Sequence, residues 1–208
     1  MSTQQKRQYV SKTRSQAADA TKARVLRAAR ALFVRHGIDR TTVARVAARA
    51  RVSVPTVYAL YKSKEGILRE LMSAALFGQG FQAAHAKLKG ISDPIKLIAL
   101  TAHVAQAIYN AESSELGLMR GASAFSPPLR KLEREFEKIR FDMQEERVRL
   151  LFAQSRQKKG LGLDEARRIL WMYTSRDVYR MLVHESGWTP DQYQSWLSET
   201  LVSSLVGS

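Results

Sequence analysis

Apolar residues recur at helical spacing in nearly every segment of this 208-residue chain, and no segment alternates apolar and polar residues as strands do. The clearest case is the segment from about residue 19 to residue 36, where one helix face carries Val25, Ala28, Ala29, Leu32 and Phe33. Hydrophobic residues make up 45% of the chain, which is enough for a packed core. The pattern therefore predicts an all-α fold, and we find no internal repeat.

Two short helices follow Gly37, which suits the left-handed position that ends a helix. Thr41 or Thr42 can cap the first of them, and Ser53 can cap the second, with Pro55 in its first turn. Only the pair Arg51-Val52 separates them, and a long fourth helix begins at Lys64. Two short helices joined by a tight turn, after a longer one, are typical of a helix-turn-helix unit.

The rest of the chain is also predicted to be helical. The expected boundaries are 94–111, a short segment over 116–124, one long helix over 129–157, another over 164–185 and a last one from a Thr189…Gln192 capping box to about Val206. We therefore predict a flexible basic arm over residues 1–17, a helix-turn-helix domain over 18–63, and a helical body over 64–208.

Positive charge is concentrated at one end of the chain, whose net charge is +15. Residues 1–70 contain 16 Lys and Arg against 4 Asp and Glu, a net charge of +12, whereas residues 71–208 contain 18 against 15, a net charge of +3. This distribution indicates a polyanion-binding head on a nearly neutral body. A solubilising surface or an anionic membrane as partner would give the same bias, and charge alone does not separate these from DNA.

Several classes of protein are excluded or disfavoured by what the sequence lacks. It has no cysteine, no apolar run of the roughly 20 residues that a membrane span needs, and no apolar signal segment in its polar first residues, so we expect a cytoplasmic protein without a membrane partner. The four histidines lack metal-ligand spacing, and no glycine-rich phosphate loop or nucleophile elbow occurs. We therefore predict no enzyme activity, no catalytic residues, no metal site and no cofactor.

The spacing of the third helix points to the residues that face DNA. The second helix of a helix-turn-helix unit lies in the major groove, with its N-terminal residues against base edges. From Ser53 onward the sequence supplies Val54, Pro55, Thr56 and Tyr58 to the outer face, followed by Lys62 and Lys64. Hydroxyl and ammonium groups at a groove edge are suited to phosphate contacts, although any three-helix corner shows similar periodicity.

Residues 21–72 resemble the DNA-binding head of the TetR family of bacterial regulators. The matching stretches are Ala29–Phe33 with Gly37, then Thr41–Val43 with Val46-Ala47, and finally Val52-Ser53, Thr56–Tyr58 and Tyr61–Glu65. The last stretch is the most specific. The resemblance covers about a quarter of the chain tightly, and it implies a head that binds palindromic operators on a body that dimerises and binds a small inducer.

By this resemblance, Thr42, Thr56, Tyr58 and Lys64 are expected at phosphates or groove edges, and Val54, Pro55, Thr56 and Ala59 where base sequence is read. Two residues depart from the family pattern. Arg51 replaces the usual turn glycine, so a left-handed backbone there costs on the order of 1 kcal/mol. Arg45 replaces a common acidic residue and is either an added phosphate or base contact or part of a solvated face.

The resemblance also implies a dimer interface made by the last two helices. Residues 169–173 are apolar on every side of a helix, which indicates burial on two faces, one of them against a second subunit. An ordinary core hairpin is the alternative. The candidates to line an inducer pocket are His103, Tyr109, Met119, Phe125, Phe141, Trp171 and Tyr173, each of which also fits a plain core position.

The sequence thus predicts a regulator, most simply a repressor, that binds a double-stranded DNA operator as a homodimer and is released by a small molecule of unknown identity. The alternative is a nucleic-acid-binding protein without sequence preference that uses the basic head. The two differ in the specificity ratio over competitor DNA.

Overall fold

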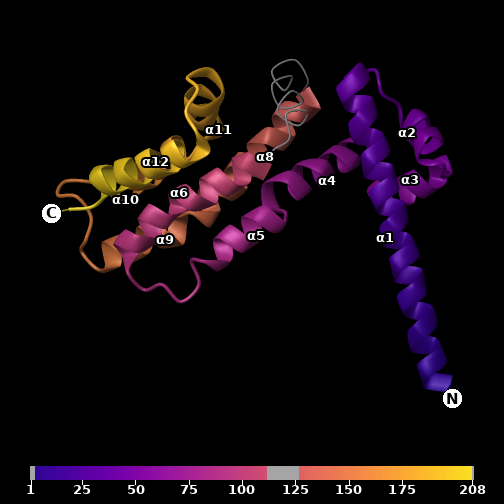
Figure 1. Ribbon diagram of the computed structural model, residues 1–208, viewed down its shortest axis with the longest axis horizontal. Helices are drawn as coiled ribbons and strands as arrows, with labels where there is room; N and C mark the ends of the chain where they lie inside the picture. The colour runs from indigo at the N-terminus through magenta and orange to yellow at the C-terminus, as the bar shows by residue number, and fades with distance from the viewer. Residues whose placement is uncertain (1–2, 112–126, 208) are drawn as a thin grey trace. The chain divides into compact units, whose positions relative to one another are not determined.

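The computed structural model describes residues 3–111 and 127–207, and every regular element within them is helical, as the sequence predicts (Figure 1). The chain divides into two compact units, one up to Ser73 and one that begins at Ala74 and includes α8 from Lys131 onward. We call them the head and the body. None of the helices within the described residues is long and apolar enough to cross a lipid bilayer.

The head contains α1 (Thr3–His36), α2 (Val43–Ala50), α3 (Val54–Tyr61) and the start of α4 (Lys64–Phe77). Both short helices begin where the sequence predicts, because Thr42 Oγ1 accepts from the Arg45 N–H at 3.2 Å and Ser53 Oγ accepts from the Thr56 N–H at 3.2 Å. Helix α1 packs on α2, and α2 on α3, around a shared apolar core. The buried side chains of this core include Val25, Ala29, Phe33, Val46, Ala47, Val57 and Ile67.

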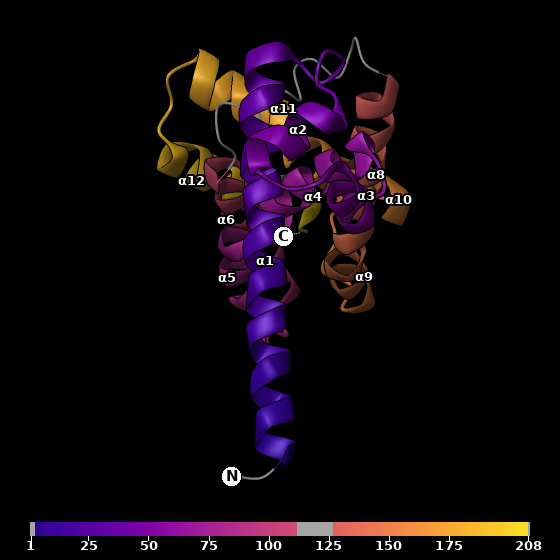
Figure 2. The same cartoon turned by 90° about the vertical axis from the view of Figure 1, so that its right-hand side faces the viewer.

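The N-terminal arm is a correction to the sequence analysis. We predicted a flexible segment over residues 1–17 and a first helix from about residue 19, but α1 begins at Thr3 and continues without a break to His36 (Figure 2). Residues 3–18 contain neither Gly nor Pro and are rich in Gln, Lys, Arg and Ala, which have high helix propensity. Because adding a residue to an existing helix costs far less than starting one, the packed part of α1 extends through this polar segment.

Two left-handed residues in the head are not glycine. Arg51, at the end of α2, has φ 53° and Lys62, at the end of α3, has φ 64°. The Arg51 N–H donates to the Ala48 carbonyl at 3.1 Å, and the Lys62 N–H donates to the Tyr58 carbonyl at 2.9 Å. Left-handed backbone at Arg51 is what the sequence predicts, and each such residue costs about 1–2 kcal/mol, which the surrounding packing offsets.

The body consists of α5 (Gln79–Ala86), α6 (Pro94–Ala111), α8 (Pro127–Met143), α9 (Glu145–Ala153), α10 (Leu163–Tyr173), α11 (Arg176–Tyr179), the π-helical turn η2 (Arg180–Glu185) and α12 (Pro190–Leu205). Helices α6 and α12 lie side by side and make the largest contact in the body (Figure 1). From α12, the fully buried residues Tyr193, Leu197, Leu201 and Leu205 recur every four residues, so one face of the helix lies in the core.

Two predicted helices of the body are each interrupted. The long helix predicted over 129–157 is α8 followed by α9, with the break at Gln144, whose buried amide donates to Thr174 Oγ1 at 2.8 Å. The helix predicted over 164–185 ends at Tyr173 because Ser175 starts a new helix, accepting from the Val178 N–H at 3.4 Å. Neither break carries a Gly or Pro. Gln144 makes a tertiary hydrogen bond at the first break, and at the second the local Ser175 cap directly follows Thr174, whose hydroxyl accepts from Gln144 and Arg140. The segment predicted over 116–124 lies outside the described residues.

Gly66, in the first turn of α4, lies so close to the end of α3 that a substitution there tests how these two helices pack. A Cβ at this position would lie 1.9 Å from the carbonyl oxygen of Tyr61, an approach that a side chain of any size prevents. We expect Gly66→Ala to lower the free energy of unfolding by about 1–3 kcal/mol, because the end of α3 must move. Gly162→Ala is the matched control, since a Cβ added there would have no atom within 4 Å and its φ is −82°. Equal denaturation curves for the two variants would contradict this packing.

Candidate nucleic-acid interface

Helix α3 has one buried face and one exposed face. Val57 and Tyr61, four residues apart, point into the core of the head with 1% and 9% of their surface exposed. Val54, Pro55, Tyr58 and Ala59 are exposed, and they form two pairs at the same four-residue spacing. A short helix with a solvent-facing surface of small, apolar and phenolic groups is what insertion into a major groove requires.

Two hydrogen bonds join α3 and α4 to the rest of the head. The Tyr61 hydroxyl donates to the Lys22 carbonyl of α1 at 3.1 Å, and Lys64 Nζ donates to the Ile38 carbonyl, after α1, at 2.9 Å. Burial, followed by the charge of Glu70, raises the pKa of the Tyr61 hydroxyl, which therefore stays a donor. Lys64 was predicted as a phosphate ligand, and in the structure its half-buried ammonium already has this internal partner.

The predicted hydroxyl contacts occupy the helix starts. Thr42 is exposed and uses one lone pair on the Arg45 N–H, which leaves its hydroxyl proton available to another acceptor. Thr56 is half-buried, and its hydroxyl lies 2.7 Å from Ser53 Oγ. The pair Ser53 and Thr56 therefore fixes the start of α3, and Thr56 has fewer free hydrogen-bonding sites for a base than the sequence suggests.

The predicted cations Arg45 and Lys62 are both exposed. The Arg45 guanidinium lies 3.4 Å from the Arg40 carbonyl and 3.4 Å from His36 Nε2, at the end of α1. Desolvation, followed by the charges of Arg45 and Arg35, lowers the pKa of His36, so its neutral ring can accept from Arg45. Lys62 directly follows α3, where an ammonium group is free to reach a phosphate.

Sequence reasoning missed Gly66 as a residue that shapes this surface, and it named Thr41 only as an alternative to Thr42 for the helix cap. Thr41 is 1% exposed, and its hydroxyl donates to the Gly37 carbonyl at 2.8 Å, which closes the turn between α1 and α2. Gly66 permits the close approach of α3 to α4. The glycine carried a signal, since a glycine inside a helix costs about 1 kcal/mol relative to alanine and so indicates a packing reason.

The inducer-pocket candidates lie in the body, where the structure gives each described one a local partner. His103 Nδ1 lies 3.1 Å from Gln194 Oε1, Phe141 stacks under the Arg167 guanidinium at 4.2 Å, and Tyr173 meets Trp196 edge to face. The remaining described pair, Tyr109 and Trp171, belongs to the polar network below. Met119 and Phe125 lie outside the described residues.

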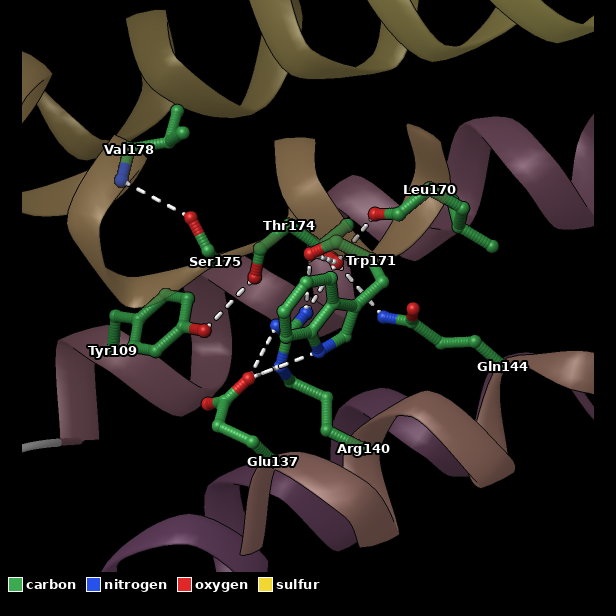
Figure 3. A network of polar contacts seen from close by, with 9 residues as sticks. All are labelled: Tyr109, Glu137, Arg140, Gln144, Leu170, Trp171, Thr174, Ser175 and Val178. Atoms are coloured by element: carbon green, nitrogen blue, oxygen red, sulfur yellow. Dashed lines mark hydrogen bonds and ion pairs between the residues drawn. The ribbon is translucent and has the colours of Figure 1, made fainter. Parts of the chain in front are cut away.

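Arg140 of α8 is the centre of that network (Figure 3). Its guanidinium donates to Glu137 at 2.6 Å and to both the Trp171 carbonyl and Thr174 Oγ1 at 2.8 Å. Trp171 Nε1 donates to the same Glu137 carboxylate at 3.0 Å, and the Tyr109 hydroxyl donates to the Thr174 carbonyl at 2.8 Å. The network thereby ties α6 and α8 to the end of α10.

A cavity of about 360 Å³ opens elsewhere in the body, between the α5–α6 turn and α8–α9. Its lining includes His85 and Lys89 from one side and Met143 and Arg147 from the other. None of the five inducer-pocket candidates that the structure describes lines it. The volume lies within the range of about 300–1,000 Å³ found for small-molecule sites.

Comparison with known proteins finds relatives of the head. Residues 25–71 match the family of bacterial regulatory proteins called the tetR family. The head of this chain is therefore similar to that family over residues 25–71. An uncharacterised helix-turn-helix transcriptional regulator of Mycobacterium tuberculosis is 41% identical over 54 residues, which cover 26% of this chain and 29% of that protein. This chain thus spans less than a third of the length of the relative that it matches. The family is one of regulatory proteins, not enzymes.

Solved structures extend the likeness to the whole fold. The regulator FadR from Bacillus subtilis, in complex with stearoyl-CoA, has a TM-score of 0.66 at 19% identity, over 87% of this chain and 97% of that one. SmeT, the repressor of the multidrug efflux pump SmeDEF of Stenotrophomonas maltophilia, has a TM-score of 0.64 at 19% identity, over 89% and 90%. The head is therefore followed by a body with the same fold as in these two regulators.

A substitution at Tyr58 can distinguish an effect on DNA docking from an effect on folding. Its side chain is 47% exposed, so Tyr58→Ala removes groove contacts without opening the core. We expect about tenfold or greater loss of affinity for both specific and non-specific DNA, as befits a phosphate contact, with an unchanged melting temperature. Val34→Ala, which removes a 41% exposed side chain from α1, is the control and should leave DNA affinity intact. Unaltered binding by folded Tyr58→Ala would refute the docking orientation.

Proposed function

We propose that this chain is a sequence-specific transcriptional repressor that binds a palindromic operator as a homodimer and releases it when a small molecule enters the body. The observation that carries the proposal is the exposed face of α3, with Val54, Pro55, Tyr58 and Ala59, on a head of net charge +12 over residues 1–70. A helix whose exposed face fits the major groove fixes the position of the head on the DNA, and the surrounding cations supply affinity for phosphate. A protein that acts on the bacterial chromosome works in the cytoplasm.

Base readout in this proposal relies on shape and apolar contact. Val54 and Ala59 have no hydrogen-bonding side chains, and Thr56 shares its hydroxyl with Ser53. Methyl groups on this face suit the C5-methyl of thymine, and the deformability of the operator contributes the rest. A single head then offers few base contacts, so useful specificity needs two heads on a two-fold-related site.

The dimer in this proposal is formed by the C-terminal helices. Among the large apolar side chains of the body that are exposed within the described residues, Met172 of α10 is 49% exposed and Met181 of η2 is 45% exposed. Large apolar groups left in solvent on neighbouring elements favour a protein interface. FadR with stearoyl-CoA and the repressor SmeT support a ligand-responsive body and a repressing role, because both share this fold.

Salt and competitor DNA test the DNA-binding proposal together. We expect the logarithm of the binding constant to fall linearly with the logarithm of salt concentration, by roughly 0.9 per phosphate neutralised. At fixed salt, an operator should outcompete random DNA by about a thousandfold or more. A steep salt slope without sequence preference would instead favour a non-specific nucleic-acid binder, and a slope near zero would remove the electrostatic basis of the proposal.

The dimer proposal is tested at an exposed position instead of in the core. Met172→Glu should convert the dimer to a monomer in light scattering and abolish operator binding, since a carboxylate cannot be buried unpaired in an interface. Ile139→Glu, at a 40% exposed apolar residue of α8, is the control and should remain dimeric. Leu201 is fully buried, so a charged residue there would disturb the core and would report on folding and not on the dimer interface. A monomer of 23.5 kDa for the unmodified protein at micromolar concentration would exclude the arrangement.

A further inference from the structure

Arg147 of α9 is a buried cation that forms no ion pair with the described part of the chain. Only 7% of its surface is exposed, and within residues 3–111 and 127–207 the structure gives its guanidinium no hydrogen bond and no ion pair. Desolvation by burial lowers its pKa to about 10, only partly countered by the charge of Glu146. A buried charge without a partner is costly, because the transfer from water is not offset by attraction or hydrogen bonds.

The other inward-lying arginines of the body behave differently. Arg140 donates to Glu137 at 2.6 Å, and Arg167 lies 2.8 Å from Glu145 with its guanidinium over the Phe141 ring. Each therefore has an internal anion that explains its position. Arg147 instead lines the cavity of about 360 Å³ between the α5–α6 turn and α8–α9.

The walls of this cavity define what fits it. Leu88, Leu97, Met143 and Leu150 contribute apolar surface, while Lys89 and His85 add nitrogen groups to the side that carries Arg147 or faces it. Glu146 is the one acidic residue of the lining, and its side chain is exposed to solvent. Desolvation, followed by the charges of Arg147 and Lys89, lowers the pKa of His85, so its ring is mainly neutral and can donate one hydrogen bond.

We propose that this cavity binds a small organic acid, with its carboxylate paired to the Arg147 guanidinium and its apolar part against Leu88, Leu97, Met143 and Leu150. A carboxylate matches the guanidinium fork with two parallel hydrogen bonds, and the buried location strengthens them. The apolar walls then select acids with a hydrocarbon or aromatic portion over inorganic anions. The assignment rests on the proposed function only in naming this acid as the inducer.

Binding is tested first without DNA, on the full-length protein. Octanoate and benzoate are the probes, octanol and benzyl alcohol are their neutral counterparts, and inorganic phosphate tests the need for an apolar part. We expect the two acids to raise the melting temperature and to bind in calorimetry, whereas the alcohols and phosphate do not. The proposal would be overturned if neither acid bound, or if an acid and its alcohol bound equally well.

Substitutions then locate the carboxylate. Arg147→Met should weaken acid binding by about tenfold or more, the loss expected for one charge-assisted pair. Its unliganded melting temperature should equal or exceed that of the unmodified protein, because an unpaired buried charge is removed. Arg149→Met, which removes the exposed arginine paired to Glu145 at 2.5 Å on the same helix, is the control and should bind as before. Unaltered acid binding by Arg147→Met overturns the proposal.

Whether the acid acts as the inducer is measured separately, as release of DNA from the protein. Adding the acid to the protein–DNA complex should release DNA from the unmodified protein and from Arg149→Met, but not from Arg147→Met. Acid binding that depends on Arg147 without any release would contradict the induction in the proposed function while leaving the site established. If the unliganded protein failed to bind DNA, the result would contradict the DNA-binding role proposed for the head and would leave the acid-binding proposal unaffected.

Discussion

The packing of Val57 and Tyr61 against the head core determines what the rest of α3 can do. A helix of eight residues does not hold its shape in water, because few hydrogen bonds offset the cost of its first turn. Helix α3 is held instead by its Ser53 cap and by these two inward side chains, with the Tyr61 hydroxyl bonded to α1. Once this face is committed to the core, Val54, Pro55, Tyr58 and Ala59 have to face outward. The candidate DNA surface is therefore a direct consequence of how the core is filled.

A polar network joins α6, α8 and α10 in the body, in addition to the apolar contact between α6 and α12. The Thr174 hydroxyl accepts hydrogen bonds from Arg140 and Gln144, and its carbonyl accepts one from Tyr109, so both groups are paired where the chain leaves the helix. The break there separates α10 from α11 and redirects the chain toward η2, which carries the exposed Met181. Arg147 has no such partners within residues 3–111 and 127–207, and this contrast within one unit is the basis for proposing that its cavity binds a carboxylate.

Sequence reasoning was reliable where a local rule decides the structure. The Thr42 and Ser53 caps, the left-handed Arg51, and the Thr189–Gln192 capping box all follow from side chains and neighbours within a few residues. It was wrong for residues 3–17, where helix propensity exceeded the expectation of a flexible arm, and at Gln144 and Thr174, where distant hydrogen bonds interrupt a periodic pattern. The cavity around Arg147 depends on residues some 60 positions apart, such as His85, and no local pattern reveals that they meet. The DNA-binding and inducer residues named from the sequence remain predictions.

Selection of bound fragments from random double-stranded DNA, followed by footprinting of the enriched site, tests the central claim most directly. The account predicts one enriched motif made of two inverted half-sites, protected symmetrically, with two protein chains per site. Enrichment of an asymmetric single half-site, or recovery of unrelated sequences bound equally well, would contradict it.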